Sequence, residues 1–282
     1  MLCSSSSITS GVDRIDLFSM TCDAELSVIK TIETPFTPVM LYGDLLAYSD
    51  LHSKTVIHNW STDTTTMFDS SVAGDDPFTN RCSQVLLMHQ SVLVVRERSL
   101  DFFPFTADST SDTETTDEAI RPITSYSLGW LEGVYASASP VSEGEVYPPI
   151  FMVSRPEGND PWGKDTHKIE LHSFQPDSAY NIGLSSCPYL PLSERAVQYQ
   201  YTTTSGPLLC PHVRLGSHGT ALWIQTDRHK HQMVGALYSE DKESVSKVLF
   251  TDISDWTCFD YHESGGMLVF GSTSGVLTMV RL

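Results

Sequence analysis

Short apolar segments rich in Val, Ile, Leu, Phe and Tyr recur along the chain, and Gly, Asp, Ser and Pro separate them. The periodicity of long helices is missing. The clearest unit holds four apolar runs with turn residues between them: Thr37–Tyr42, Asp44–Ser49, Thr55–Trp60 and Thr64–Phe68. Four consecutive short strands are typical of one blade of a β-propeller.

The second strand of this unit recurs later in the chain. Its equivalents centre on Leu46, Leu93, Phe151, Leu222 and Leu268, at spacings of 47, 58, 71 and 46 residues. Propeller blades repeat about every 40–50 residues. The two long intervals contain inserts, an acidic Ser/Thr-rich stretch at 106–119 and a Pro/Ser/Tyr-rich segment at 176–207. The pattern therefore predicts an all-β fold, a β-propeller of about five to six four-stranded blades.

The last blade reaches only its third strand. Each second strand is followed by a third, at Thr55–Trp60, Leu100–Phe105, His167–Phe174, Met233–Tyr238 and Val276–Leu282. The propeller is therefore either incomplete or closed by an N-terminal strand, for which Arg14–Met20 and Glu25–Ile32 are the candidates. The segment Asp23–Ile32 also fits a short helix.

These patterns predict one folded domain. We expect a disordered tail at 1–12 and a single propeller domain at 13–282, with a disordered acidic insert at 106–119 and a long loop at 176–207.

Composition narrows the possible partners and the compartment. Hydrophobic residues make up 40% of the chain, enough for a core, and the formal net charge is −18. That charge repels phosphate backbones and anionic lipid, so we expect neither nucleic acid nor membrane as a partner. No secretory signal is visible, and the six cysteines form no CxxC pair. A cytoplasmic or nuclear protein with reduced structural thiols is the expectation.

Three motifs partly match known catalytic or ligand-binding motifs. The segment Gly158–Lys164 has the spacing of a phosphate-binding loop, but the strand-like His167–Phe174 follows it where a helix is needed. Gly271–Gly275 approaches a serine-nucleophile motif, yet Thr273 holds the nucleophile position and a turn explains the glycines. The third motif, the pair His229 and His231, has no third or fourth metal ligand nearby. We expect no catalytic residue, no cofactor and no metal.

Two loops carry charged and aromatic residues suited to binding a protein. Trp162 stands beside a turn with Arg155 and Asp160 near it, and Arg228 and His229 occupy a predicted hairpin loop. Aromatic and arginine side chains are enriched at interface hot spots. We therefore assign Arg155, Asp160, Trp162, Arg228 and His229 as candidate partner-binding residues.

The blade sequences also resemble a known family. The runs GDLLAYSD, SVLVVRERSLDFFPF, GTALWIQTDR and WTCFDYHESGGMLVFGSTSGVLTMVRL are similar to the C-terminal region of F-box proteins from mushroom-forming (basidiomycete) fungi. The resemblance covers residues 36–282 and implies a divergent WD-repeat propeller that selects proteins for a Skp–cullin ubiquitin ligase. Nothing near the start resembles the helical F-box. The chain is then either a shortened gene product or splice form, or a free-standing propeller that retains partner binding.

The function expected from the sequence is a non-enzymatic protein–protein interaction module, a possible ubiquitin-ligase adaptor. Its partner would be a protein, for instance a ubiquitination substrate, and a Skp-type adaptor only if an F-box-like contact exists. Two alternatives stay open at this point. One is an enzyme whose site lies in the propeller channel, and the other is a truncated scaffold without independent function.

Overall fold

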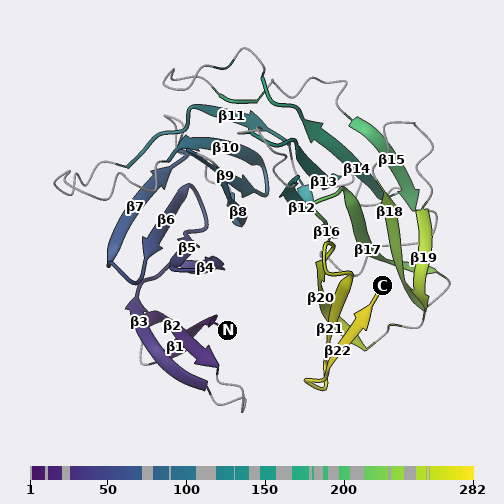
Figure 1. The fold of residues 1–282 in the computed structure, drawn as a ribbon, viewed down its shortest axis with the longest axis horizontal. Coiled ribbons are helices and arrows are strands. Elements are labelled where there is room, and N and C mark those ends of the chain that lie inside the picture. Colours follow the sequence, from purple (N-terminus) through teal and green to yellow (C-terminus); the bar gives the residue numbers. More distant parts are fainter. Residues whose placement is uncertain are drawn as a thin grey trace. The chain divides into compact units, whose positions relative to one another are not determined.

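The structure, a computed structural model, consists of strands and connecting turns (Figure 1). It describes residues 2–9, 12–20, 26–71, 79–88, 90–105, 119–129, 131–139, 147–156, 167–177, 180, 187–189, 197–203, 213–227, 230–237, 246–251, 253 and 255–282. These residues contain no helix, and hence none that is long and apolar enough to cross a membrane. The contacts divide the chain into two compact units, Met1–Ser127 and Leu128–Leu282.

The first unit contains three antiparallel sheets. Sheet 1 has the order β1-β2-β3, sheet 2 the order β4-β5-β6-β7 and sheet 3 the order β11-β10-β9-β8. The strands are β1 (Leu2–Thr9), β2 (Val12–Met20), β3 (Leu26–Glu33), β4 (Thr37–Tyr42), β5 (Leu45–Ser49), β6 (Lys54–Asn59), β7 (Thr64–Asp69), β8 (Cys82–Met88), β9 (Ser91–Arg96), β10 (Ser99–Pro104) and β11 (Thr124–Ser127).

The second unit also contains three antiparallel sheets. Sheet 4 has the order β12-β13-β14-β15, sheet 5 the order β16-β17-β18-β19 and sheet 6 the order β20-β21-β22. The strands are β12 (Leu131–Ala138), β13 (Ile150–Pro156), β14 (His167–Phe174), β15 (Val197–Thr203), β16 (Val213–Leu215), β17 (Thr220–Asp227), β18 (Lys230–Leu237), β19 (Ser246–Thr251), β20 (Trp256–His262), β21 (Met267–Ser272) and β22 (Leu277–Arg281).

The four-stranded unit predicted from Phe36 to Phe68 is sheet 2, and its boundaries agree with the prediction to within one or two residues. Two of its three hairpin turns show why the strands end there. Gly43 has a φ of +55°, which glycine adopts without a Cβ penalty, and Asp63 has a φ of +62°, which aspartate tolerates better than most residues. The five predicted second strands are β5, β9, β13, β17 and β21, each the second strand of its sheet along the chain.

The second strands of the four-stranded sheets have apolar runs because both of their faces are buried. In β5, Leu46 and Tyr48 pack in a cluster with Ile15 and Leu17 of sheet 1, whereas Ala47 between them belongs to a cluster with sheet 3. Successive side chains of a strand point to opposite faces, so a middle sheet needs apolar residues at every position. In β17, Leu222 and Ile224 likewise pack with sheet 6, and Ala221 and Trp223 with sheet 4. Within each unit the core therefore lies between consecutive sheets.

Three segments differ from the sequence-based expectation. Leu2–Thr9 is strand β1, paired with β2, where a disordered tail was expected. Leu26–Glu33 is strand β3 rather than a short helix, and β2 lies between β1 and β3 with both of its edges paired. The long loop expected at 176–207 contains β15, the fourth strand of sheet 4. Its Gln and Tyr residues alternate with period two, a strand signal that the surrounding Pro and Ser residues obscured.

The remaining domain expectations stay predictions. Of the acidic insert at 106–119, all residues except Ala119 lie outside the described part of the chain. The single-domain assignment of 13–282 likewise stays a prediction. The contacts of the structure divide the chain into two compact units.

Candidate functional site

The residues predicted to bind a partner are only partly visible. Asp160, Trp162, Arg228 and His229 lie outside the residues that the structure describes. Arg155 lies near the end of β13 and is 5% exposed. The partner-binding assignment of all five residues therefore stays a prediction.

Of the motifs with a possible chemical role, Gly158–Lys164 and His229 lie outside the described residues. His167–Phe174, which follows the phosphate-loop-like segment, is strand β14, as predicted. Residues 272–276 connect β21 and β22 by a hairpin turn, with Gly275 at a φ of +77° and the Val276 amide donating to Ser272 Oγ at 3.0 Å. The serines of this segment thus stabilise a turn.

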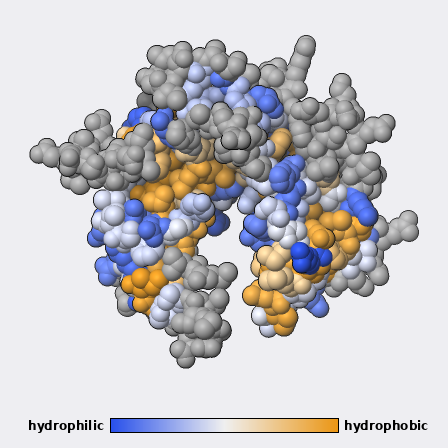
Figure 2. All heavy atoms as spheres, in the orientation of Figure 1, coloured by the Kyte–Doolittle hydropathy of each residue, from blue (hydrophilic) through white to orange (hydrophobic). Residues whose placement is uncertain are grey.

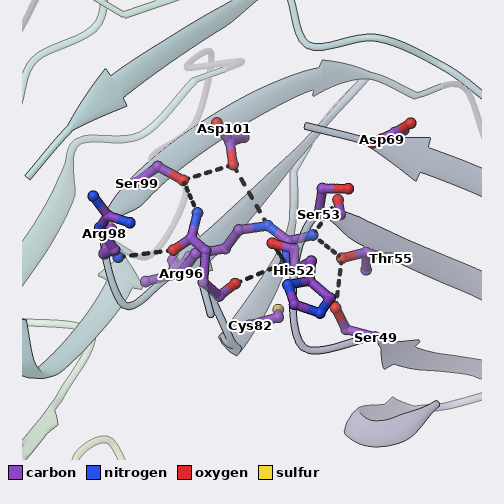
Figure 3. Close-up of polar contacts among 12 residues, drawn as sticks. Ser49, His52, Ser53, Thr55, Asp69, Cys82, Arg96, Arg98, Ser99 and Asp101 are labelled. Carbon is purple, nitrogen blue, oxygen red and sulfur yellow. Dashed lines mark hydrogen bonds and ion pairs between the residues drawn. The ribbon is translucent and has the colours of Figure 1, made fainter. Parts of the chain in front are cut away.

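The most extensive buried polar site within the described residues joins sheets 2 and 3 (Figure 3). Arg96, at the end of β9, is 0% exposed. Its Nη1 donates to the carbonyl oxygens of His52 at 3.2 Å and Asn80 at 3.1 Å. Its Nη2 donates to the carbonyl oxygen of Ser53 at 2.5 Å and to Thr55 Oγ1 at 2.8 Å. We call these residues, with Ser99 and Asp101, the Arg96 cluster.

Asp101 balances the charge of Arg96 at a distance. Its Oδ2 lies 3.6 Å from Arg96 Nε, an ion pair that is too long for a hydrogen bond, and it accepts a hydrogen bond from Ser99 Oγ at 3.0 Å. The guanidinium has its Nη donors directed at four oxygens, and the side chain is sealed from solvent. It therefore has no accessible donor for an external anion, and the arrangement suits a structural tie between the β5–β6 turn and β9.

Cys82 lies opposite Arg96 in the β8–β9 pairing. Burial raises the pKa of its thiol to about 11, although the nearby Arg96 charge acts in the opposite direction. A thiol with so high a pKa stays protonated near neutral pH, so it is a poor nucleophile.

A serine, a histidine and a glutamate meet on sheet 4 without forming a catalytic triad. Ser154 Oγ lies 3.2 Å from His172 Nε2, and Glu170 Oε2 lies 3.7 Å from the same nitrogen. A triad needs the carboxylate on the other ring nitrogen, where it orients the base. Ser154 and His172 are also buried, and burial lowers the pKa of His172 more strongly than Glu170 raises it. This cluster is not arranged to present a nucleophile to a substrate.

Asp63 in the β6–β7 turn ties β3 to sheet 2. Its Oδ1 accepts hydrogen bonds from Lys30 Nζ at 2.6 Å and from His58 Nε2 at 2.9 Å. The pKa of Asp63 is lowered, first by the hydrogen bond from Lys30 and then by that from His58. Both hydrogen-bond donors to Asp63 are side chains of unit 1, so this site is also a structural contact. Within the described part of the chain no group of three metal-ligating side chains occurs.

The exposed apolar surface is concentrated at one place. Eleven large apolar side chains of the described residues are exposed, and five of them lie on or beside the last hairpin: Met267, Val276, Leu277, Met279 and Leu282. Leu277 is 76% and Met279 is 67% exposed. Figure 2 shows orange, apolar surface in this region. Exposed apolar patches of this kind mark interaction sites in soluble proteins.

Strand β22, which carries these residues, is the edge of a three-stranded sheet. Sheets 2, 3, 4 and 5 each have four strands, whereas the described residues of sheet 6 provide only β20, β21 and β22. An edge strand presents unpaired N–H and C=O groups, and β22 has neither a proline nor a lysine to block pairing. Sequence reasoning predicted that the last blade ends at its third strand, but it did not identify the edge of that strand as a binding site. The signal that could have indicated the site is the mostly apolar run LTMV in this last strand.

Comparisons with known proteins support the fold. No protein-family model and no curated protein matches the sequence. Among solved structures, the β-propeller domain of Cps50 (Swd1) from Myceliophteria thermophila is similar over 96% of this chain and 78% of its own, at a TM-score of 0.56 and 7% identity. A protein from Lactobacillus plantarum is similar over 99% of this chain and 81% of its own, at a TM-score of 0.52 and 10% identity.

The WD40 domain of Pan2 from Neurospora crassa gives a TM-score of 0.48 at 8% identity, over 98% of this chain and 73% of its own. At identities this low the likenesses concern the fold alone. The four-stranded antiparallel sheets and the likeness to the Cps50 (Swd1) domain together establish an all-β fold of the β-propeller class.

Proposed function

We propose that this protein is a non-enzymatic protein–protein interaction module. The observation that carries the proposal is the contrast between its buried polar clusters and its exposed apolar side chains. The described clusters of ionisable residues at Arg96 and His172 are buried, whereas the last hairpin exposes five large apolar side chains. Buried polar clusters stabilise a fold, and clustered exposed apolar side chains gain free energy when a partner covers them.

The resemblance to fungal F-box proteins supports a finer hypothesis. In it the propeller selects a protein for ubiquitination in the cytoplasm or nucleus. Asp160, Trp162, Arg228 and His229 contribute to the contact, whereas the burial of Arg155 argues against a direct contact by that residue. A Skp-type adaptor would bind only through an F-box-like contact. The enzyme alternative has no support in the described clusters, because neither Ser154 nor Cys82 is an accessible, activated nucleophile.

Affinity purification of the tagged chain from its native cells, followed by mass spectrometry, tests both levels. Recovery of protein partners in stoichiometric amounts supports the interaction module, and recovery of Skp and cullin supports the ligase adaptor. The variant Trp162→Ala with Arg228→Ala should reduce recovery if the predicted loops bind the partner. Leu51→Ala, a truncation of an exposed apolar residue in the β5–β6 turn, is the matched control. Absence of any specific partner would contradict the proposal.

A further inference from the structure

We propose that the open edge of β22 binds an extended segment of a partner protein, which adds a fourth strand to sheet 6. The segment would be nearly uncharged and would contain aromatic or aliphatic residues together with Ser, Thr or Gln. This inference rests on the proposed interaction function and names the surface and the chemistry of its partner. Addition of a strand to a sheet edge is an established mode of peptide recognition, in which main-chain hydrogen bonds supply affinity.

The hydrogen bonds of the last hairpin determine which backbone groups face the open edge. The Ser272 amide donates to the Val276 carbonyl at 3.0 Å, and the Leu282 amide donates to the Gly266 carbonyl at 2.7 Å. Residues of an antiparallel strand direct their N–H and C=O groups alternately toward the two neighbouring strands. The bonds at Val276 and Leu282 point toward β21. Counting along the strand, Leu277, Met279 and Arg281 direct their backbone groups toward the open edge.

The side chains at the edge are also suited to a partner strand. Leu277 and Met279 are the two most exposed residues of the apolar group, and two positions apart they lie on the same face of the sheet. A partner strand could place apolar side chains beside both of them on that face. Cross-strand apolar pairs stabilise a sheet, and the main-chain bonds add to this. The edge thus offers backbone groups and apolar contacts at the same residues.

The protein's own fourth strands indicate the chemistry of the occupant. In the four complete sheets this position is taken by TTTMFD of β7, TSYS of β11, VQYQYTT of β15 and SKVLFT of β19. Each contains a Phe or a Tyr and at least one Ser or Thr. The four together carry only two charged residues, Asp69 and Lys247. A segment of the same kind should fit the same place in sheet 6.

A second copy of this chain is a less suitable occupant than a different protein. Each copy carries a formal net charge of −18, so two copies repel one another at low ionic strength. A nearly uncharged segment of another protein avoids this cost. The formation of a β22–β22 dimer is therefore an outcome that the test must detect.

The test uses the full chain and a fluorescein-labelled peptide with the sequence of Val197–Thr203. Fluorescence anisotropy should show saturable binding. The variant Met279→Pro removes an outward-facing N–H while leaving the inferred β21–β22 bonds in place, so the dissociation constant should rise more than tenfold. Met279→Val keeps the N–H and the strand propensity, and its affinity should stay within about threefold of wild type. A peptide with proline at its central position should not bind.

A second variant distinguishes loss of the binding edge from misfolding caused by Met279→Pro. Leu277→Lys combined with Met279→Lys keeps every backbone group but places charges at the edge, and it should also lose the peptide. Equal binding by wild type, Met279→Pro and the double lysine variant would overturn the proposal, as would the absence of binding to wild type. Sedimentation of wild type as a dimer that Met279→Pro dissociates would overturn it in favour of a second copy.

Purification of partners with Met279→Pro separates this inference from the proposed function. If wild type and Met279→Pro recover the same partners, the edge is not the site, and the interaction function stands. If neither recovers a partner, the proposed function itself fails.

Discussion

The junction between sheets 2 and 3 and the junction between sheets 5 and 6 solve the same packing problem in different ways. Both contain an apolar cluster, built around Phe68 and Phe103 in the first and around Phe259 and Phe270 in the second. The first junction adds a buried arginine whose Nη donors are directed at four oxygens. The second adds Arg214, which is partly exposed, pairs with Asp260 at 3.1 Å and lies 5.1 Å from the ring centroid of Tyr135 in sheet 4.

The difference shows where a charge contributes to stability. Arg96 has lost all contact with water. Removing it leaves the buried Asp101 without its counter-charge and takes a hydrogen-bond donor from the carbonyl oxygens of His52 and Asn80. Arg214 pairs with a carboxylate that is 76% exposed, and water can replace either partner. A buried ion pair is costly to break from one side, whereas an exposed pair contributes little.

The largest effect should come from Arg96→Met, which keeps the length of the side chain and removes the charge. We expect it to lower the free energy of unfolding by about 3–5 kcal/mol, because Asp101 is left buried without its counter-charge. Urea denaturation followed by tryptophan fluorescence measures this change. Arg98→Met, two residues further along, is the control and should cost less than about 1 kcal/mol. Equal stability of the two variants would contradict the structural role of Arg96.

A smaller effect is expected from Thr55→Val, which removes one acceptor of Arg96 without changing the shape of the side chain much. Arg96 Nη2 keeps the Ser53 carbonyl but loses Thr55 Oγ1. Leaving one buried N–H donor of Arg96 without its acceptor should lower the free energy of unfolding by about 1–2 kcal/mol. The same denaturation experiment checks it, and a double-mutant cycle with Arg96→Met should show that the two effects are not additive. Additive effects would mean that the two side chains act separately.

At the second junction Arg214→Met should have a still smaller effect, below about 1 kcal/mol, since methionine keeps part of the contact with Tyr135 and Phe259. The contribution of the Asp260 pair should also fall with added salt. Measuring the stability of wild type and variant at low and high NaCl concentration tests this. A loss as large as that of Arg96→Met would remove the distinction between the two junctions.

The smallest effect concerns pH. Burial lowers the pKa of His172 in the folded state below its unfolded value of about 6.5. The unfolded chain therefore binds more protons, and the stability that neutral His172 provides above pH 6.5 is lost as the pH falls below it. Wild type should lose more stability between pH 7 and pH 5 than His172→Gln. Equal losses of stability in wild type and His172→Gln over this pH range would contradict this role of His172.

Much of the fold could be predicted because its signals are local. The turn glycine Gly43, the alternating runs of sheet 2 and the second strands buried on both faces are all visible as short patterns. The strands β1 and β15 were missed because Ser-rich and Pro-rich surroundings conceal a strand whose pairing partner lies elsewhere along the chain.

The candidate sites depended on distant contacts. Residues 52, 80 and 96 come together only when two sheets pack, and no spacing in the sequence indicates it. The partner-binding candidates were chosen from residue type and position beside turns, a criterion that treats Arg155 as a surface residue although its side chain is buried.

The sequence by itself determined the strand class and the repeat of the second strand, because alternation and turn residues act over a few neighbours. Only the tertiary structure decided that Arg96 is a structural residue, since burial and the positions of carbonyl oxygens are set by packing between sheets. It likewise decided that Leu277 and Met279 are exposed on β22, which pairs with β21 alone among the described strands, because a strand's exposure depends on which strands lie beside it.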